Sequence, residues 1–274
     1  MTRRVPRPTP TPAAHARAPW VWAAVGSVLG LALVLGLAAP AHWLAWGLAQ
    51  ASQQRVQLHD AQGTVWHGNA QFTLGTADPQ APRSALPGRV AWQLQPNWRG
   101  LRLELQMPCC LDGSWAWTLQ PQGGGLELKA QDRSPQQALR LPAKLLASLG
   151  TPWNTLQLQG MLALSTQALA VSLAPGQLQL QGQLQLQALG LSTSLSTLQP
   201  IGSYQLRVQG GAEPTLELQT LEGALQLQGS GRLQAGRLQF TGFASAAAGR
   251  EEALANLLNI IGRRDGARSV IQVG

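Results

Sequence analysis

The sequence predicts a mainly β protein, in which an N-terminal transmembrane helix precedes a large, curved, mostly antiparallel sheet of open-groove or sandwich-like form. Three observations predict this class. Leucine and glutamine alternate over much of the chain, glycine or proline separates most of the alternating runs, and an uncharged apolar run lies near the N-terminus. One short connecting helix and one C-terminal helix complete the predicted elements.

The alternation is strongest over residues 156–189, where leucine and glutamine alternate almost strictly along the sequence. Successive side chains of a strand point to opposite faces, so this period of two puts leucines on one face and glutamines on the other. Short alternating runs with turn signals between them predict an antiparallel meander. Further runs of this kind begin at Leu101, Leu126, Tyr204, Leu216, Ala224 and Arg237.

Charge is scarce, since only 12% of the 274 residues are charged and the 62 residues of 145–206 contain no Asp, Glu, Lys or Arg. Four arginines lie in the first 19 residues, so residues 20–274 hold 16 basic and 12 acidic side chains and only +4 of the net charge of +8. A nucleic-acid-binding protein would cluster Lys and Arg on one stripe or beside aromatic side chains. We therefore expect no nucleic-acid partner.

Residues 20–48 predict a transmembrane anchor, after a proline-rich and disordered tail over residues 1–19. About 20 apolar residues suffice to cross the hydrocarbon core of a bilayer, and the chain has no charged residue between Arg17 and Arg55. The upstream arginines place the N-terminus in the cytoplasm. Residues 49–274 then form a periplasmic β domain of a single-pass inner-membrane protein. The predicted anchor residues are Trp20, Trp22, Leu31, Leu35, Trp43 and Trp46.

The order of elements after the anchor follows from turn and helix signals. Residues 49–60 are expected to continue as a short helix that ends near Asp60. A turn followed by the first strand is expected within residues 61–68, and a second strand over residues 86–94. A short helix is predicted within residues 134–152, because Pro142 can begin it and Gly150 can end it. Its apolar residues are Leu145, Leu146 and Leu149, and this segment leaves open a subdomain boundary.

The C-terminal helix is predicted from an apolar face that repeats with helical spacing within residues 249–266. Glu251 and Glu252 fall in its first turn and Arg263 and Arg264 in its last, which complements the helix dipole. We expect it to cover the apolar face of the sheet, and a last short strand to follow. The residues of its apolar face are Leu254, Leu257, Leu258 and Ile261.

Cys109 and Cys110 are the only cysteines, and they are adjacent. In an oxidising compartment they can form a vicinal disulfide, or one of them can bridge to another molecule. Two buried thiols are the other interpretation. Two cysteines alone are too few for a metal site.

Motifs for catalysis or cofactor binding do not stand out from the sequence. His59, Asp60 and His67 could be drawn as a metal cluster, but polar surface residues beside a strand explain them more simply. No phosphate-binding loop, nucleophile elbow or zinc-protease motif occurs. We therefore expect neither an enzyme nor a cofactor.

Six segments together resemble the type II secretion system protein N family over nearly the whole chain. They are GTVWHG at Gly63, LPGRVAW at Leu86, LPAKLLASLGTPWNTLQLQG at Leu141, IGSYQLRVQG at Ile201, LEGALQLQGSGR at Leu221 and NLLNIIGRRDGARSVIQVG at Asn256. The resemblance implies an inner-membrane accessory component of the Gram-negative machine that moves folded proteins from the periplasm through the outer-membrane secretin. Its partners would be other components of that machine.

Two functional hypotheses of different classes are compatible with the one-sided strands. In the first, the protein is a structural adaptor that uses strand edges and the Leu/Gln surface to bind partners. In the second, it is a carrier whose leucine face holds lipid or another apolar ligand, since the pattern is also similar to that of AsmA-like groove proteins. Protein packing covers the leucines in the first case, and a ligand covers them in the second.

We predict that the anchor is retained in the mature protein. Ala39-Pro40-Ala41 imitates a signal-peptide cleavage site, but it contains a proline and the apolar sequence continues through Trp46. Intact-mass measurement of the protein isolated from membranes should give the whole chain, with a mass of 29.1 kDa. A mature chain that begins at His42 would contradict this prediction.

Overall fold

The computed structural model describes residues 20–76, 83–98, 100–151, 153–174, 177–234 and 237–274. The predicted disordered tail, residues 1–19, lies outside the described residues. The chain divides into two compact units, residues 1–39 and residues 40–274.

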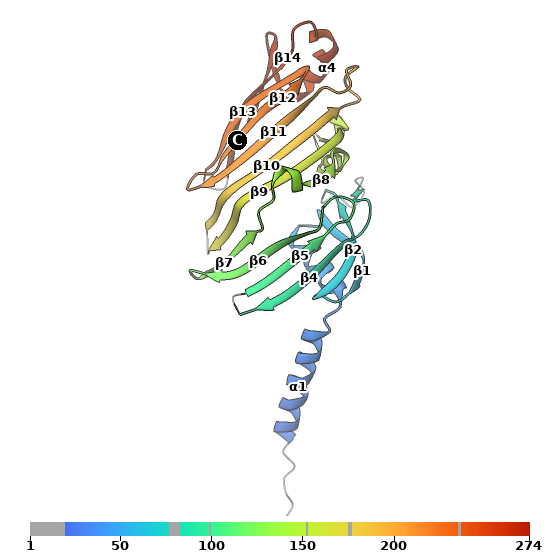
Figure 1. Cartoon of the computed structure of the whole chain (residues 1–274), viewed down its shortest axis with the longest axis vertical. Coiled ribbons are helices and arrows are strands. Elements are labelled where there is room, and N and C mark those ends of the chain that lie inside the picture. Colours follow the sequence, from blue (N-terminus) through green and yellow to red (C-terminus); the bar gives the residue numbers. More distant parts are fainter. Residues whose placement is uncertain (1–19, 77–82, 99, 152, 175–176, 235–236) are drawn as a thin grey trace, which may run out of the picture. The chain divides into compact units, whose positions relative to one another are not determined.

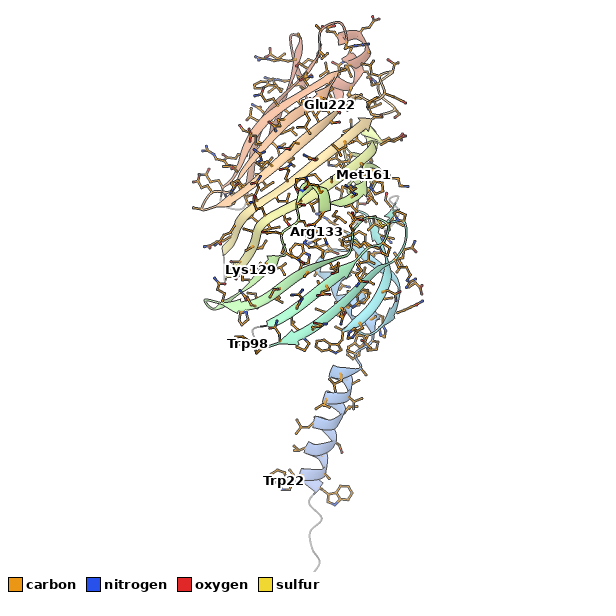
Figure 2. The ribbon with its side chains drawn as sticks, viewed as in Figure 1. Trp22, Trp98, Lys129, Arg133, Met161 and Glu222 are labelled. Atoms are coloured by element: carbon orange, nitrogen blue, oxygen red, sulfur yellow. A yellow bond between two sulfur atoms is a disulfide. The ribbon has the colours of Figure 1, made fainter. Side chains whose placement is uncertain are left out.

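Helix α1 (Trp20–Leu37) is the element described in the first unit. Its length and composition allow it to cross a membrane. Its described side chains are exposed, among them Leu31, Leu35 and Trp20. Trp22, near its start, is 77% exposed (Figure 2). Such a fully apolar and exposed helix is typical of a segment that meets lipid rather than water.

The predicted anchor over residues 20–48 is not one continuous helix. Helix α1 ends at Leu37, and a second helix, α2 (Ala41–Ala51), begins after Pro40, whose backbone is extended. Proline disfavours helical geometry in the residue before it and lacks the N–H that an uninterrupted helix needs. Trp43 and Trp46 therefore lie on a helix of the second unit.

The predicted helix over residues 49–60 is wrong in its second half, because α2 ends at Ala51 and the first strand begins at Val56. The Ser52 hydroxyl accepts a hydrogen bond from the Val56 N–H and donates to the Val56 carbonyl. These bonds reverse the chain locally and turn it into the sheet.

All strands of the second unit form one 16-stranded antiparallel sheet, which confirms the predicted fold class (Figure 1). The order is β1-β2-β4-β5-β6-β7-β9-β10-β11-β12-β13-β14-β16-β15, with β3 beside β2 and β8 beside β9. The first eight strands are β1 (Val56–Gly63), β2 (His67–Leu74), β3 (Ser84–Ala85), β4 (Val90–Asn97), β5 (Gly100–Gln106), β6 (Ser114–Gln122), β7 (Gly125–Ala130) and β8 (Leu139–Pro142). The others are β9 (Gln159–Ala174), β10 (Gln177–Ser192), β11 (Gly202–Gly211), β12 (Thr215–Gly223), β13 (Leu225–Gln234), β14 (Arg237–Ala246), β15 (Arg263–Asp265) and β16 (Arg268–Val273).

The register keeps leucines opposite leucines and glutamines opposite glutamines. One row crosses β9 to β12 through Leu164, Leu186, Leu206 and Leu218. The neighbouring row, on the opposite face, contains Gln187, Gln205, Gln219 and Gln228. The period of two thus produces one apolar face and one polar face.

Three helical segments cover part of the apolar face. Ala41 of α2 packs with Ala70 and Trp92 on β2 and β4. A 3₁₀ helix, η2 (Ala143–Leu149), contributes Ala143 to one core cluster and Leu145 to another. The third segment, α4 (Glu251–Ile261), packs against the last strands (Figure 1).

The connecting helix predicted within residues 134–152 is found as η2, between β8 and a single helical turn, α3 (Trp153–Leu156). A shorter 3₁₀ turn, η1 (Pro135–Gln137), precedes β8. Of the predicted apolar residues, Leu145 is buried, whereas Leu149 is 46% exposed. The segment lies inside the second compact unit.

Helix α4 supplies three of the largest fully buried side chains among the described residues. Leu254, Leu257 and Leu258 are at most 1% exposed and share a cluster with Leu225 and Ala244, while Ile261 packs partly against it. The Ser269 hydroxyl donates to the Leu258 carbonyl at 2.6 Å and ties the helix to β16.

Arg263 and Arg264 do not form the last turn of this helix. Gly262 is extended, so the helix ends at Ile261 and both arginines enter β15. Their backbones then pair with Val270 and Ser269 of β16.

We predict that Leu258→Ala lowers the free energy of unfolding by about 2–5 kcal/mol, because it leaves a cavity among buried side chains. Ile260→Ala is the matched control, since Ile260 lies on the same helix and is 39% exposed. Urea unfolding of the full chain in detergent, followed by tryptophan fluorescence, measures both. Equal loss of stability in the two variants would contradict a capping role for the buried face of α4.

Candidate interaction surfaces

The two edges of the sheet differ in how open they are to another strand. At the first edge, β1 contains an irregularity between His59 and Gln62, and Asp60 there has a left-handed φ of 50°. The neighbouring helix α2 also packs on β1, through Leu44 and Leu58. Bulges and covering elements are devices that block strand addition at an edge.

The second edge is more open. The short strand β15 pairs with β16 only from Arg268 to Val270, so within the described residues Ile271, Gln272 and Val273 have a strand partner on one side only. Gln272 and Val273 are exposed, and Val273 is 51% exposed. Unpaired backbone groups at such an edge are a template for a strand of a partner. We call residues 271–273 the C-terminal edge.

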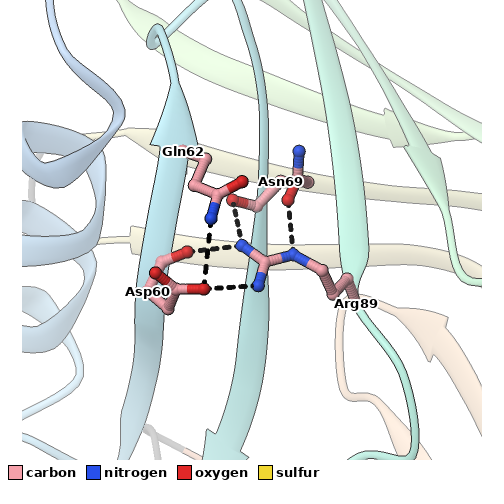
Figure 3. Close-up of polar contacts among 4 residues, drawn as sticks. All are labelled: Asp60, Gln62, Asn69 and Arg89. Atoms are coloured by element: carbon pink, nitrogen blue, oxygen red, sulfur yellow. Dashed lines mark hydrogen bonds and ion pairs between the residues drawn. The ribbon is translucent and has the colours of Figure 1, made fainter.

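A polar network fixes the irregularity of β1 (Figure 3). Arg89 donates from Nη1 to Asp60 Oδ2 at 2.6 Å, from Nη2 to the Asp60 carbonyl and from Nε to Asn69 Oδ1. Gln62 Nε2 donates to the same carboxylate at 3.3 Å. The hydrogen bond and charge of Arg89 lower the pKa of the Asp60 carboxyl below its ordinary value. The Asp60 carboxylate therefore forms an ion pair with Arg89 that has a structural role.

Sequence reasoning singled out His59, Asp60 and His67 but missed Arg89, which binds one of them. The signal was available in LPGRVAW, where the arginine follows a Pro-Gly turn and directly precedes a strand. Across the described ranges, no group of three His, Cys, Asp or Glu side chains lies close enough to hold a metal ion.

The GTVWHG segment forms the turn from β1 to β2. Thr64 Oγ1 accepts a hydrogen bond from the His67 N–H at 3.1 Å, and Trp92 Nε1 donates to the Val65 carbonyl at 3.0 Å. The Trp92 ring lies where a Cβ of Gly68 would stand. This segment thus packs the first end of the sheet.

The polar face is built largely from uncharged side chains. Gln185 and Gln187 donate from Nε2 to Gln205 Oε1 at 3.0 and 3.3 Å. Among the described residues, one carboxylate is buried on this face, that of Glu127, which accepts from Lys129 at 2.8 Å. The hydrogen bond from Lys129 lowers the pKa of Glu127 and outweighs the effect of its burial.

Two further features lie in the connections between strands, one between β5 and β6 and the other between β7 and β8. Cys109 and Cys110 are joined by a disulfide, with Cys109 exposed and Cys110 in a core cluster. Arg133, between β7 and β8, is 7% exposed and donates to the carbonyls of Asp112, Ser114 and Gln137. Burial lowers the pKa of this guanidinium. The sequence showed no periodic signal for Arg133, since it lies between two strands.

These features define a class of protein: a one-sided antiparallel sheet preceded by an apolar helix, with one open edge and an apolar face that three helical segments cover in part. The family model for type II secretion system (T2SS), protein N, matches residues 54–271. The chain belongs to this family, which confirms the predicted resemblance and identifies an accessory component of type II secretion. No curated protein and no solved structure matches the chain.

We predict that the Asp60–Arg89 pair stabilises the fold only while Asp60 is ionised. The folded-state pKa is lowered, so the stabilisation is present above the unfolded carboxyl pKa of about 3.9 and is lost as pH falls through the folded pKa. Asp60→Asn should therefore be slightly less stable than the parent at pH 7, and their unfolding midpoints should converge at low pH.

The control for this experiment is Glu213→Gln, which removes an exposed carboxylate from the turn between β11 and β12. Glu213 makes no ion pair within the described part of the chain, so its replacement should leave the midpoint at pH 7 unchanged. A constant difference between Asp60→Asn and the parent at every pH would show that the ion pair contributes nothing.

Proposed function

We propose that the protein is a membrane-anchored adaptor of the type II secretion system, with α1 in the inner membrane and the sheet in the periplasm. The family match over residues 54–271 carries this proposal. It spans almost all of the second compact unit, so the sheet is the part that family members share. Helix α1 supports the anchoring, since it is long and apolar enough to cross a bilayer.

The C-terminal edge is the surface that we assign to a partner in the secretion machinery. Strand addition supplies affinity from main-chain hydrogen bonds and specificity from alternate side chains. Here Val273 would lie on the apolar face and Gln272 on the polar face, as the pairing with Phe240 and Thr241 requires. The other components of type II secretion are the partners that the family implies.

We predict that deletion of the gene leaves secreted substrates folded in the periplasm and lowers their release to the medium, and that the full chain restores release. Activity of a secreted hydrolase in the medium and in the periplasmic fraction measures this. Entry into the periplasm should be unchanged, because the adaptor acts after that step. Normal release after deletion would contradict the proposed function.

The edge itself is tested with Val273→Lys, because a lysine at an open edge opposes strand addition. We expect this variant to restore secretion several-fold less well than the parent. Leu221→Lys is the matched control, since it places the same charge at a leucine that is 45% exposed in the interior strand β12. Equal activity of the two variants would show that partners do not use this edge.

A further inference from the structure

Beyond the three covering helices, the apolar face continues across the middle of the sheet. A row runs from Leu119 on β6 through Leu128 on β7 to Val171 on β9. Val171 itself pairs with Leu180 of β10. Past a register irregularity of β10, a second row runs from Leu184 through Val208 on β11 to Leu216 on β12. We call this set the apolar strip. Its members are Leu119, Leu128, Val171, Leu184, Val208 and Leu216.

The strip is accessible to solvent. All six side chains are partly exposed, and they do not belong to the core clusters that α2, η2 and α4 cover. Leucines at its margin are more open still, with Leu126 47% exposed and Leu173 49% exposed. A ligand that covers the strip would bury apolar surface at about 25 cal/mol per Å².

The strip offers an approaching ligand only aliphatic contact. In the described strands from β6 to β12, Asp, Glu, Lys and Arg side chains lie on the opposite face, as the registers of Glu127, Lys129, Arg207 and Glu217 show. The backbone N–H and C=O groups of these interior strands are used within the sheet. The strip therefore presents neither charge nor a directional hydrogen bond.

Protein partners usually meet a different surface. The centres of protein interfaces are enriched in Tyr, Trp, Phe, Met and Arg, whereas the strip contains leucine and valine alone. An acyl chain requires no hydrogen bond or charge and gains from aliphatic contact. The chemistry of the strip thus matches the hydrocarbon of a lipid better than the surface of a protein.

The strip is also long enough for such a chain. From β6 to β12 it crosses six neighbouring strands, and five spacings of about 4.8 Å give a length of roughly 24 Å. One leaflet of a bilayer has a hydrocarbon thickness of about 15 Å, half of the roughly 30 Å core. The strip is therefore wide enough, across its strands, for an extended acyl chain to lie on it.

The apolar face is continuous with the segment that follows α1 in the chain. Only residues 38–40 separate Leu37 from Ala41, and three residues span at most about 11 Å. Ala41 and Leu44 of α2 pack on this same face beside Leu103. Leu101 of β5 then pairs with Leu119 at the start of the strip. If α1 is in the membrane, as proposed for the function, only this short connection separates the membrane-spanning helix from the residue at which the apolar face begins.

We propose that the apolar strip binds the acyl chain of a membrane lipid. The ligand class is a phospholipid or another lipid with one long aliphatic chain in contact with the strip. This binding goes beyond the adaptor function, because it uses the middle of the apolar face and not the C-terminal edge.

Site-specific photo-crosslinking in cells tests the proposal with the full chain in its own membrane. A benzophenone amino acid replaces Val208 in one variant and Gln209 in the other. These neighbours on β11 point to opposite faces, and Gln209 is exposed. Cells are grown with a radiolabelled fatty acid, irradiated, and the purified chain is examined for label.

We expect several-fold more label on the Val208 variant than on the Gln209 variant. No label at Val208, equal label at both positions, or a protein adduct in place of a lipid adduct at Val208 would overturn the proposal. The secretion assay is read separately on the same cells. Failure of lipid crosslinking with normal secretion would thus leave the adaptor function standing.

A second measurement changes the strip itself. The double variant Leu184→Gln, Val208→Gln puts two amides into the aliphatic row, and label captured by a benzophenone at Leu216 should fall several-fold. Gln183→Ala with Gln209→Ala is the control on the polar face and should keep the label. An unchanged unfolding midpoint shows that each variant is folded. Retention of label by the folded double variant would overturn the proposal.

Discussion

The architecture depends on one constraint: leucines on a single face of a very wide sheet must be kept from water. No second sheet lies over them within the described residues, so helical segments from three different parts of the chain cover the face in part. Full burial of a leucine contributes about 1.5–3 kcal/mol. The nearly complete burial of Leu254, Leu257 and Leu258 therefore makes α4 a principal source of stability.

The opposite face is adapted to water without the usual density of charge. Each ion pair of the described residues has at least one partner that is 39% exposed or more, and such pairs contribute little to stability. Glutamines on neighbouring strands instead hydrogen-bond to one another, as Gln185 and Gln187 do with Gln205. Where charged side chains are buried, as at Glu127 and Arg133, local hydrogen bonds satisfy them.

This division separates the covered and the uncovered surfaces of the sheet in space. The covered parts of the apolar face hold the fold together, the open C-terminal edge is available to a protein strand, and the uncovered strip is available to an acyl chain. A sheet of this width, behind an apolar helix, can offer separate surfaces to proteins and to lipid.

The sequence alone determined the properties that repeat locally. The Leu/Gln period predicted antiparallel strands and the identity of each face, and the helical spacing of Leu254, Leu257, Leu258 and Ile261 predicted α4 from Glu251 to Ile261. Tertiary structure decided what depends on distant partners. The pairing of Arg263 and Arg264 with β16, the binding of Asp60 by Arg89 and the packing of α2 on β2 and β4 each join segments that no local period relates. The period of a sequence determines to which face a side chain points. Which distant residue it contacts depends on the order of the strands and on which helices pack on the apolar face.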